Sequence, residues 1–143
     1  MGELRIGTSG WSYPSGPGTW NGIFYPKTRS KKAGTKDFDE LRFYAEHFDT
    51  VEVNSTFYGQ PRAEVARTWV ERTPRGFEFS LKLYQKFTHP KMFKEAALKS
   101  APGSEGPLLD LLAQVTQADI DDYRAGIEPL AASARLGALL AQF

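Results

Sequence analysis

Polar side chains that could do acid–base or charge-stabilising chemistry alternate with apolar residues in two short segments. Glu52 and Asn54 alternate with valines in the run Thr50–Tyr58, and Lys82 ends a second alternating run, Phe77–Lys82. Successive side chains of a strand point to opposite faces, so we expect the polar groups and the apolar groups to lie on different faces. A carboxylate can act as a base, and an ammonium can stabilise developing negative charge. These residues are therefore the first candidates for a functional site.

Further candidates lie in segments that follow predicted strand ends. In the run Gly7–Tyr13, two glycines flank hydroxyl residues, which favours backbone N–H groups that hold an anion; a plain strand-to-loop turn is the alternative. His89 follows the run Phe77–Lys82 and could exchange a proton near neutral pH. The catalytic candidates are thus Glu52, Lys82 and His89, and the substrate-binding candidates are Thr8, Ser9, Trp11, Trp20, Asn54, Phe57 and Tyr58.

Two histidines and no cysteines argue against a multi-histidine or thiolate metal centre, so no metal ligand is assigned. The residues indicate no particular cofactor. The aromatic members of the substrate-binding set could stack against a base or a sugar.

These side chains must be positioned by an alternation of strands and helices. Short apolar alternations predict strands over 3–7, 50–54, 77–82 and 136–143, and apolar spacings of three and four predict helices over 37–48, 61–73 and 116–134. Asp37 with Glu40, and Thr116 with Asp119, resemble helix caps. Helical patterns between strands predict a parallel sheet of βα units, in which functional groups gather at the carboxyl ends of the strands.

Two stretches interrupt this pattern. Residues 27–36 form a basic loop that could touch phosphates or remain a hydrated tip, with Lys27, Arg29, Lys31, Lys32 and Lys36 and no acid among them. Residues 91–115 are expected to form an irregular insertion around a Pro- and Gly-rich centre, with a short helical segment over 108–115.

The composition of the sequence limits the class of protein to which it can belong. The 143 residues are 41% hydrophobic and 24% charged, which is typical of one globular domain. The sequence has no long apolar run and no signal pattern, so we expect a cytoplasmic protein without membrane contact. Residues 1–99 hold sixteen Lys and Arg against eleven Asp and Glu, and the remainder reverses the balance. The basic half could meet an anionic partner, although most such imbalance is solvated surface.

Several motifs together resemble a known family. They are Gly7-Thr-Ser-Gly-Trp11, Trp20-x-Gly22-x-Phe-Tyr-Pro26, Val51-Glu-x-Asn-Ser-Thr-Phe-Tyr58, Thr73-Pro74, Phe77-x-Phe79-x-x-Lys82, Thr88-His89, and Leu136-Gly137 with Gln142. They are similar to those of the YecE-like proteins, domain-of-unknown-function family number 72, from Arg5 to the last residue. The resemblance implies a TIM-type (β/α)8 barrel and no agreed reaction.

A barrel of this type needs about 200–250 residues. We therefore expect residues 1–143 to be the N-terminal half of a single barrel domain, with four parallel strands, intervening helices, and the remainder of the barrel missing from this chain. The resemblance implies later segments, similar to Glu-Phe-Arg and Arg-x-His-Gly, that do not occur here. Such a half exposes two sheet edges and apolar surface, which predicts self-association or poor order.

Three functional interpretations stay open. The first is a hydrolase that acts on a phosphate-bearing or nucleic-acid substrate at the barrel mouth, where the likeness to apurinic-site endonucleases is an analogy of fold alone. The second is a non-catalytic module that binds an anion or nucleic acid through the same residues. The third is structural: Glu52 and Lys82 form a buried ion pair bridged by Asn54.

Overall fold

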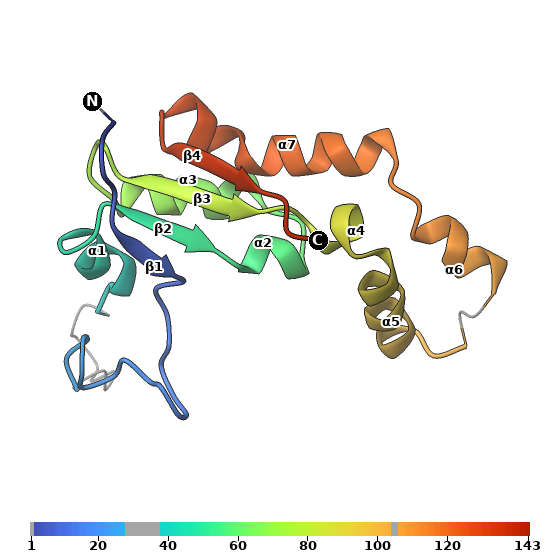
Figure 1. Ribbon diagram of the computed structural model, residues 1–143, viewed down its shortest axis with the longest axis horizontal. Helices are drawn as coiled ribbons and strands as arrows, with labels where there is room; N and C mark the ends of the chain where they lie inside the picture. The colour runs from blue at the N-terminus through green and yellow to red at the C-terminus, as the bar shows by residue number, and fades with distance from the viewer. Residues whose placement is uncertain (1, 28–37, 104–105) are drawn as a thin grey trace.

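The computed structural model describes residues 2–27, 38–103 and 106–143 (Figure 1). Its centre is one sheet of four parallel strands in sequential order, so the α/β prediction is confirmed. The strands are β1 (Gly7–Ser9), β2 (Thr50–Val53), β3 (Glu78–Lys82) and β4 (Leu136–Leu140). The closed barrel stays a prediction.

Three longer connections between the strands contain helices, and short helices follow the strand ends. They are α1 (Glu40–Ala45), α2 (Ser55–Tyr58), α3 (Ala63–Glu71), α4 (Gln85–Thr88), α5 (Pro90–Ser100), α6 (Pro107–Leu112) and α7 (Gln117–Ala132). Helices α3 and α7 run along the sheet, whereas α5 and α6 extend away from it beyond the strand ends (Figure 1). None of the described helices is long and apolar enough to cross a membrane.

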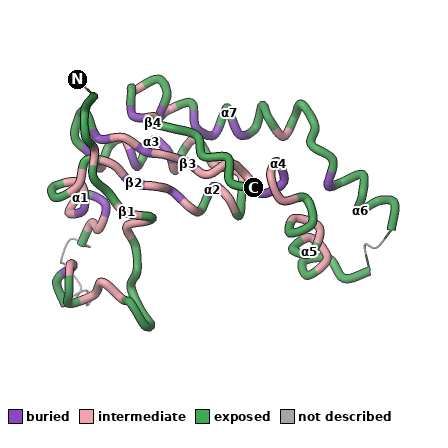
Figure 2. The backbone as a smooth tube through the Cα atoms, viewed as in Figure 1, coloured by how far each residue is buried: buried purple, intermediate pink, exposed green. Residues whose placement is uncertain are grey.

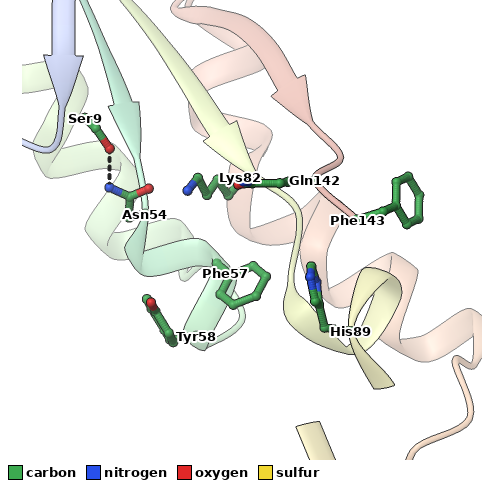
Figure 3. Close-up of a pocket in the computed structure, with 8 residues that line it drawn as sticks. All are labelled: Ser9, Asn54, Phe57, Tyr58, Lys82, His89, Gln142 and Phe143. Carbon is green, nitrogen blue, oxygen red and sulfur yellow. Dashed lines mark hydrogen bonds between the residues drawn. The ribbon is translucent and has the colours of Figure 1, made fainter. Parts of the chain in front are cut away.

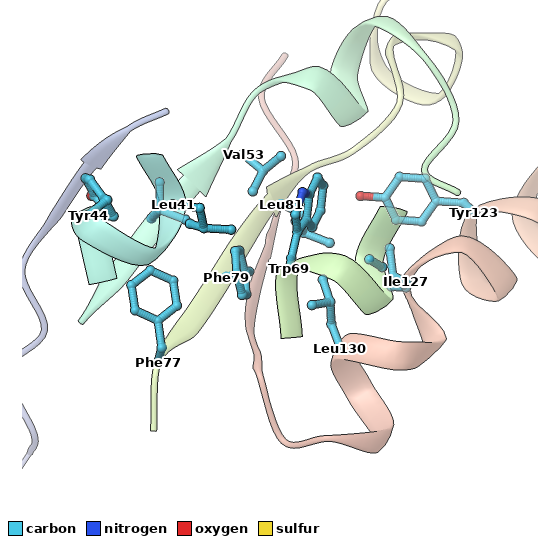
Figure 4. Close-up of a cluster of buried hydrophobic side chains, with 12 residues drawn as sticks. Leu41, Tyr44, Val53, Trp69, Phe77, Phe79, Leu81, Tyr123, Ile127 and Leu130 are labelled. Carbon is cyan, nitrogen blue, oxygen red and sulfur yellow. The ribbon is translucent and has the colours of Figure 1, made fainter. Parts of the chain in front are cut away.

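One face of the sheet forms the hydrophobic core with α1, α3 and α7 (Figure 4). The strand residues on this face are Val51, Val53, Phe79 and Leu81, and the helices contribute Leu41, Tyr44, Ala66, Trp69, Tyr123, Ile127 and Leu130. Burial is concentrated in β2, β3 and these helices, while β4, α5 and α6 are largely exposed (Figure 2). The apolar residues of the predicted alternations are therefore the core residues, and their polar neighbours face the other way.

The first strand lies later in the chain than predicted. It was expected over 3–7, but β1 begins at Gly7 and ends at Ser9. The pairing of β1 with β2 starts with Gly7 opposite Thr50, the first residue of β2. Leu4 and Ile6 therefore precede the paired part of the chain, and both side chains are exposed. A Cβ atom on Gly7 would lie 1.9 Å from the Thr50 carbonyl oxygen, which explains why a glycine begins the strand.

The irregular insertion expected over 91–115 is wrong over residues 91–100, which belong to helix α5, whereas α6 confirms the short helical segment predicted over 108–115. Pro90 and Pro107 stand in the first turns of these helices, where the missing N–H is not needed and the fixed φ angle favours helix. An ion pair between Lys94 and Asp110 joins the two helices. Helices therefore lie on both sides of the Pro- and Gly-rich centre.

The helix caps were predicted with mixed success. Helix α1 begins at Glu40, and its cap is Asp39, whose side chain accepts from the Arg42 N–H; the predicted cap, Asp37, lies outside the described residues. At α7 the predicted capping box is confirmed: Thr116 and Asp119 each accept a hydrogen bond from the other's backbone N–H. Both caps were predicted from the capping-box pattern. At α1 this pattern is ambiguous, because Asp37 and Asp39 both lie just before the helix in the sequence.

Asp119 also joins α7 to α4. Its carboxylate lies 2.8 Å from the Lys86 ammonium, and the two side chains are only 19% and 10% exposed. Burial opposes ionisation of Asp119, but hydrogen bonds from Lys86 and Thr116 outweigh this effect and lower the pKa of the carboxyl. The ion pair therefore contributes stability at neutral pH.

Replacing Asp119 by Asn keeps an acceptor for the cap but leaves the Lys86 ammonium without its anion. We expect Asp119→Asn to lower the free energy of unfolding by about 3 kcal/mol at pH 7, measured by urea denaturation. Because the folded-state pKa of Asp119 is lowered, the difference in the free energy of unfolding between wild type and Asp119→Asn is complete above the ordinary pKa of an aspartate. It disappears as the pH falls through the folded-state value, below about pH 4. The control Asp122→Asn removes an exposed charge from the same helix; an equal loss there would contradict the assignment.

Association through the open sheet edges is a second prediction. In the described parts of the chain, β1 and β4 each pair with a single strand, and Leu139 of β4 is 47% exposed. We expect the sedimentation coefficient of the 143-residue chain to rise with concentration. Leu139→Lys should weaken this rise, because a lysine on an edge strand discourages pairing. A monodisperse, cooperatively melting wild-type monomer over that range would rule the prediction out.

Candidate functional site

The polar side chains on the face opposite the core meet at the carboxyl ends of the first three strands. Ser9 pairs in register with Glu52, and Lys82 ends β3, the strand beside β2. Asn54 follows the last residue of β2, and the chain then turns at once into α2. Parallel pairing thus brings together residues from three separate parts of the sequence, as predicted.

These four residues are linked by direct contacts. The Ser9 hydroxyl donates to Glu52 Oε1 at 3.1 Å. Asn54 Nδ2 donates to Ser9 Oγ at 2.6 Å, the bond that Figure 3 marks with a dashed line. Lys82 Nζ lies 3.4 Å from Glu52 Oε1, and the two side chains are 22% and 33% exposed. The ion pair is therefore half-buried rather than fully buried, and Asn54 reaches it through Ser9 rather than bridging it directly.

Asn54 has a second polar atom that the protein does not satisfy. Its Oδ1 is buried and has no hydrogen-bond partner in the part of the chain that the structure describes. A buried amide oxygen without a partner is costly, and such groups in native proteins often mark ligand or water sites. The orientation of Asn54 is set by its donor bond to Ser9, which leaves this oxygen beside the strand ends.

A cavity of about 410 Å³ opens at this point (Figure 3). Its lining residues come from four strand ends and two short helices: Ser9, Asn54, Phe57, Tyr58, Lys82, His89, Gln142 and Phe143. Six of them were predicted as site residues. Glu52, the seventh predicted residue of this group, lies against Ser9 and Lys82 without lining the cavity itself. The lining therefore presents an ammonium, an imidazole, aromatic rings and neutral polar groups, with no carboxylate side chain from the described residues.

Helix α2 and the residue that follows α4 provide the aromatic part of the wall. Phe57 and Tyr58 lie in the single turn of α2, which the sequence alone did not predict. The Phe57 ring meets the His89 ring edge-on, with centroids 5.3 Å apart. His89 Nδ1 lies 2.8 Å from the Thr88 hydroxyl, so one ring nitrogen has a fixed partner.

Three predicted binding residues do not line the cavity. Thr8 alternates with Ser9 along β1, and its hydroxyl lies 2.9 Å from the Tyr44 hydroxyl on the helix side. The Trp11 ring packs edge-on against Trp69, and the Trp20 ring stacks near Tyr44. These aromatic side chains belong to the packing around the core, and the sequence did not distinguish that role from a binding role. Of the predicted basic loop, 28–36 lies outside the described residues.

Two lining residues were missed. Gln142 and Phe143 follow β4, but the predicted fourth strand ran to the end of the chain and so concealed that the strand stops at Leu140. Gln142 was already part of the motifs that carry the family resemblance. The rule that functional groups follow strand ends would have found both, once the strand was given its correct length.

The comparison with known proteins identifies the family. The family model described as "Protein of unknown function DUF72" matches residues 5–143. The chain belongs to this family. It is 36% identical over 85 residues to the UPF0759 protein YunF of Bacillus subtilis, covering 59% of this chain and 26% of that protein. It is 32% identical over 86 residues to the UPF0759 protein YecE of Escherichia coli K12, covering 60% of this chain and 25% of that protein.

Solved structures agree with the family assignment. A DUF72 family protein of Thermotoga maritima superposes with a TM-score of 0.61 at 28% identity, covering 97% of this chain and 44% of that one. A DUF72 family protein of Enterococcus faecalis superposes with a TM-score of 0.51 at 25% identity, covering 76% of this chain and 34% of that one. The chain thus matches less than half of the length of each relative.

Within the residues that the structure describes, no group of three or more His, Asp and Glu side chains is placed to hold a metal ion. The groups that meet at the site are one ammonium beside a carboxylate, one imidazole, and a hydroxyl and an amide in contact.

The contact between Asn54 and Ser9 gives a testable consequence. Asn54→Asp replaces the donor by a carboxylate that faces the Ser9 oxygen and lies near Glu52. We expect a loss of about 1–2 kcal/mol in the free energy of unfolding at pH 7, and a smaller loss at pH 4, where a protonated carboxyl can donate again. Asn54→Ala removes the bond without adding charge, so its loss should be the same at both pH values. Equal pH profiles for the two variants would contradict the assigned hydrogen bond.

Proposed function

We propose that the strand-end cavity binds a phosphate-bearing ligand of the nucleotide or nucleic-acid class. The observation that carries this proposal is the composition of the lining, which combines Lys82 and His89 with neutral polar groups and includes no carboxylate side chain from the described residues. An ammonium has three N–H donors, and the contact with Glu52 occupies one of them. The others are available to phosphate oxygens, for which lysine is a common partner.

The aromatic side chains favour a ligand that carries a base or a sugar in addition to the phosphate. Phe57, Tyr58 and Phe143 are the three aromatic residues other than His89 that line the cavity (Figure 3). Stacking on an aromatic side chain stabilises a bound base and tolerates different sequences. The cavity volume of about 410 Å³ is in the range of small-molecule sites and is large enough for one nucleotide unit.

Hydrolysis of a phosphate ester is the second candidate, and the position of Glu52 favours it. The carboxylate contacts both the Ser9 hydroxyl and the Lys82 ammonium at the cavity edge. In such a reaction a water oxygen would bond to phosphorus and transfer its proton to Glu52. The ester P–O bond would break, and the leaving oxygen would take a proton from protonated His89. Lys82 would stabilise the negative charge of the transition state. In the predicted barrel this chemistry would take place at the mouth.

Binding can be tested directly with the 143-residue chain. We expect the melting temperature to rise with the concentration of inorganic phosphate and, at lower concentration, of adenosine monophosphate; adenosine alone should have a weaker effect. Lys82→Met should weaken phosphate binding at least about tenfold, because it removes the cation. Lys99→Met makes the same charge change on the exposed face of α5 and should leave the affinity unchanged.

The outcomes separate the three interpretations. No shift with any of these compounds would reject binding and leave the ion pair as a structural feature. A shift that Lys82→Met removes, without turnover of a phosphodiester such as bis(p-nitrophenyl) phosphate, would favour a binding module. Turnover that Glu52→Gln reduces by about a hundredfold or more, with phosphate affinity retained, would favour the hydrolase.

A further inference from the structure

The carbonyl oxygen of Lys82 loses its expected partner at the point where β2 ends. Along β3, the Glu78 N–H donates to the Asp49 carbonyl on the β2 side, whereas the Leu83 N–H donates to Leu140 on the β4 side. Even-numbered residues of β3 therefore bond toward β2, because alternate residues of a parallel strand bond to opposite neighbours. The pairing with β2 stops at Val53 opposite Leu81. The carbonyl of Lys82 points past that end, toward a chain that has already turned into α2.

Two side-chain hydroxyls take the place of the missing strand. Thr56 Oγ1 of α2 donates to the Lys82 carbonyl oxygen at 2.7 Å, and the Tyr123 hydroxyl of α7 donates to the same atom at 2.9 Å. A carbonyl oxygen has two lone pairs, so these bonds satisfy it completely. A buried carbonyl without partners would be costly, which explains why polar atoms reach this position from two different elements.

Both donors are held firmly. Thr56 and Tyr123 are 2% and 3% exposed, so neither hydroxyl can easily exchange this bond for one to solvent. Burial raises the pKa of Tyr123 to about 12, and the hydroxyl keeps its proton at any physiological pH. Figure 4 shows the Tyr123 ring projecting from α7 toward the sheet, with its hydroxyl at the tip.

We infer that Thr56 and Tyr123 are positioning residues for Lys82: they fix the backbone from which the ammonium reaches Glu52 and the cavity. The same junction fixes the cavity wall, because Thr56 directly precedes Phe57 in α2. The effect on ligand binding rests on the proposed function, whereas the effect on the Lys82 side chain does not.

Helix α7 supports this corner of the molecule at further points. Asp119 pairs with Lys86 of α4 at 2.8 Å, and its carbonyl accepts from the Gln60 side chain, which follows α2, at 2.9 Å. Together with the Tyr123 bond, α7 therefore contacts the segments that follow β2 and β3. The helix that packs behind the sheet thus also holds the loops that form the cavity.

The test uses two substitutions that remove one hydroxyl each and preserve shape, Thr56→Val and Tyr123→Phe. Thr73→Val is the matched control: Thr73 is also buried, and its hydroxyl donates to the Trp69 carbonyl at the end of α3. Thr56→Ser keeps the hydroxyl and serves as the rescue variant. All variants are compared well below their melting temperatures, so that each measurement is made on folded protein.

The first readout is independent of any ligand. It is the 1H–15N NMR signal of the Lys82 ammonium, assigned by its loss in Lys82→Met. We expect Thr56→Val and Tyr123→Phe to shift or broaden this signal, and Thr73→Val and Thr56→Ser to leave it in place. An unchanged signal in both hydroxyl-deletion variants would overturn the inference.

The second readout is the dissociation constant for inorganic phosphate. We expect each hydroxyl deletion to weaken phosphate binding about fivefold, with Thr56→Ser close to wild type. Affinities equal to that of Thr73→Val would overturn the inference for binding even if wild type binds phosphate. If wild-type protein does not bind phosphate, the proposed function fails, and the NMR signal alone decides whether the two residues position Lys82.

Discussion

The strict alternation of side chains along β2 and β3, held between parallel neighbours, is the constraint on which the rest of the structure depends. It directs Val51, Val53, Phe79 and Leu81 into the core, where α1, α3 and α7 cover them. The same alternation directs Glu52 and Lys82 to the opposite face, and β1 adds Ser9 beside them. A shift of one residue in the pairing would exchange these two sets, so burial of the core fixes the polar face as well.

The polar face gains its chemical character from the different lengths of the strands. Strand β2 stops at Val53, one position before β3 stops, and the chain turns into the single turn of α2. This early stop brings Asn54, Phe57 and Tyr58 to the cavity and leaves the Lys82 carbonyl to the hydroxyls of Thr56 and Tyr123. A longer β2 would have continued the sheet and removed both the aromatic wall and the junction.

The ion pair between Glu52 and Lys82 is open to more than one role. Its two side chains keep about a third and a fifth of their surface exposed, so the pair is screened by solvent and adds little to stability. Compared with the more deeply buried pair of Lys86 and Asp119, it is poorly suited to hold the fold together. A partly exposed cation that lines a cavity, with N–H donors that Glu52 does not occupy, is better suited to bind a ligand.

Much of this protein could be predicted from the sequence, because the governing patterns are local. The alternations predicted β2 and β3 and their two faces, the helical spacings predicted α3 and α7, and the pair of Thr116 with Asp119 predicted a cap. Where two patterns compete locally, prediction failed: prolines and glycines up to residue 107 suggested irregular chain from residue 91 on, although Pro90 begins the helix α5. The motifs also predicted the family to which the chain belongs.

The sequence by itself determined β2, β3, α3 and α7, the face on which the side chains of these strands lie, and the strand ends at which polar groups gather. Only the tertiary structure decided which of those groups meet. Thr8, Trp11 and Trp20 have the same residue types as a binding site, but they are only partly buried and contact Tyr44 or Trp69 at the border of the core. Gln142 and the Tyr123 hydroxyl reach the site from distant segments. The reason is that strand register and strand length are set by contacts between segments, and no local pattern contains those contacts.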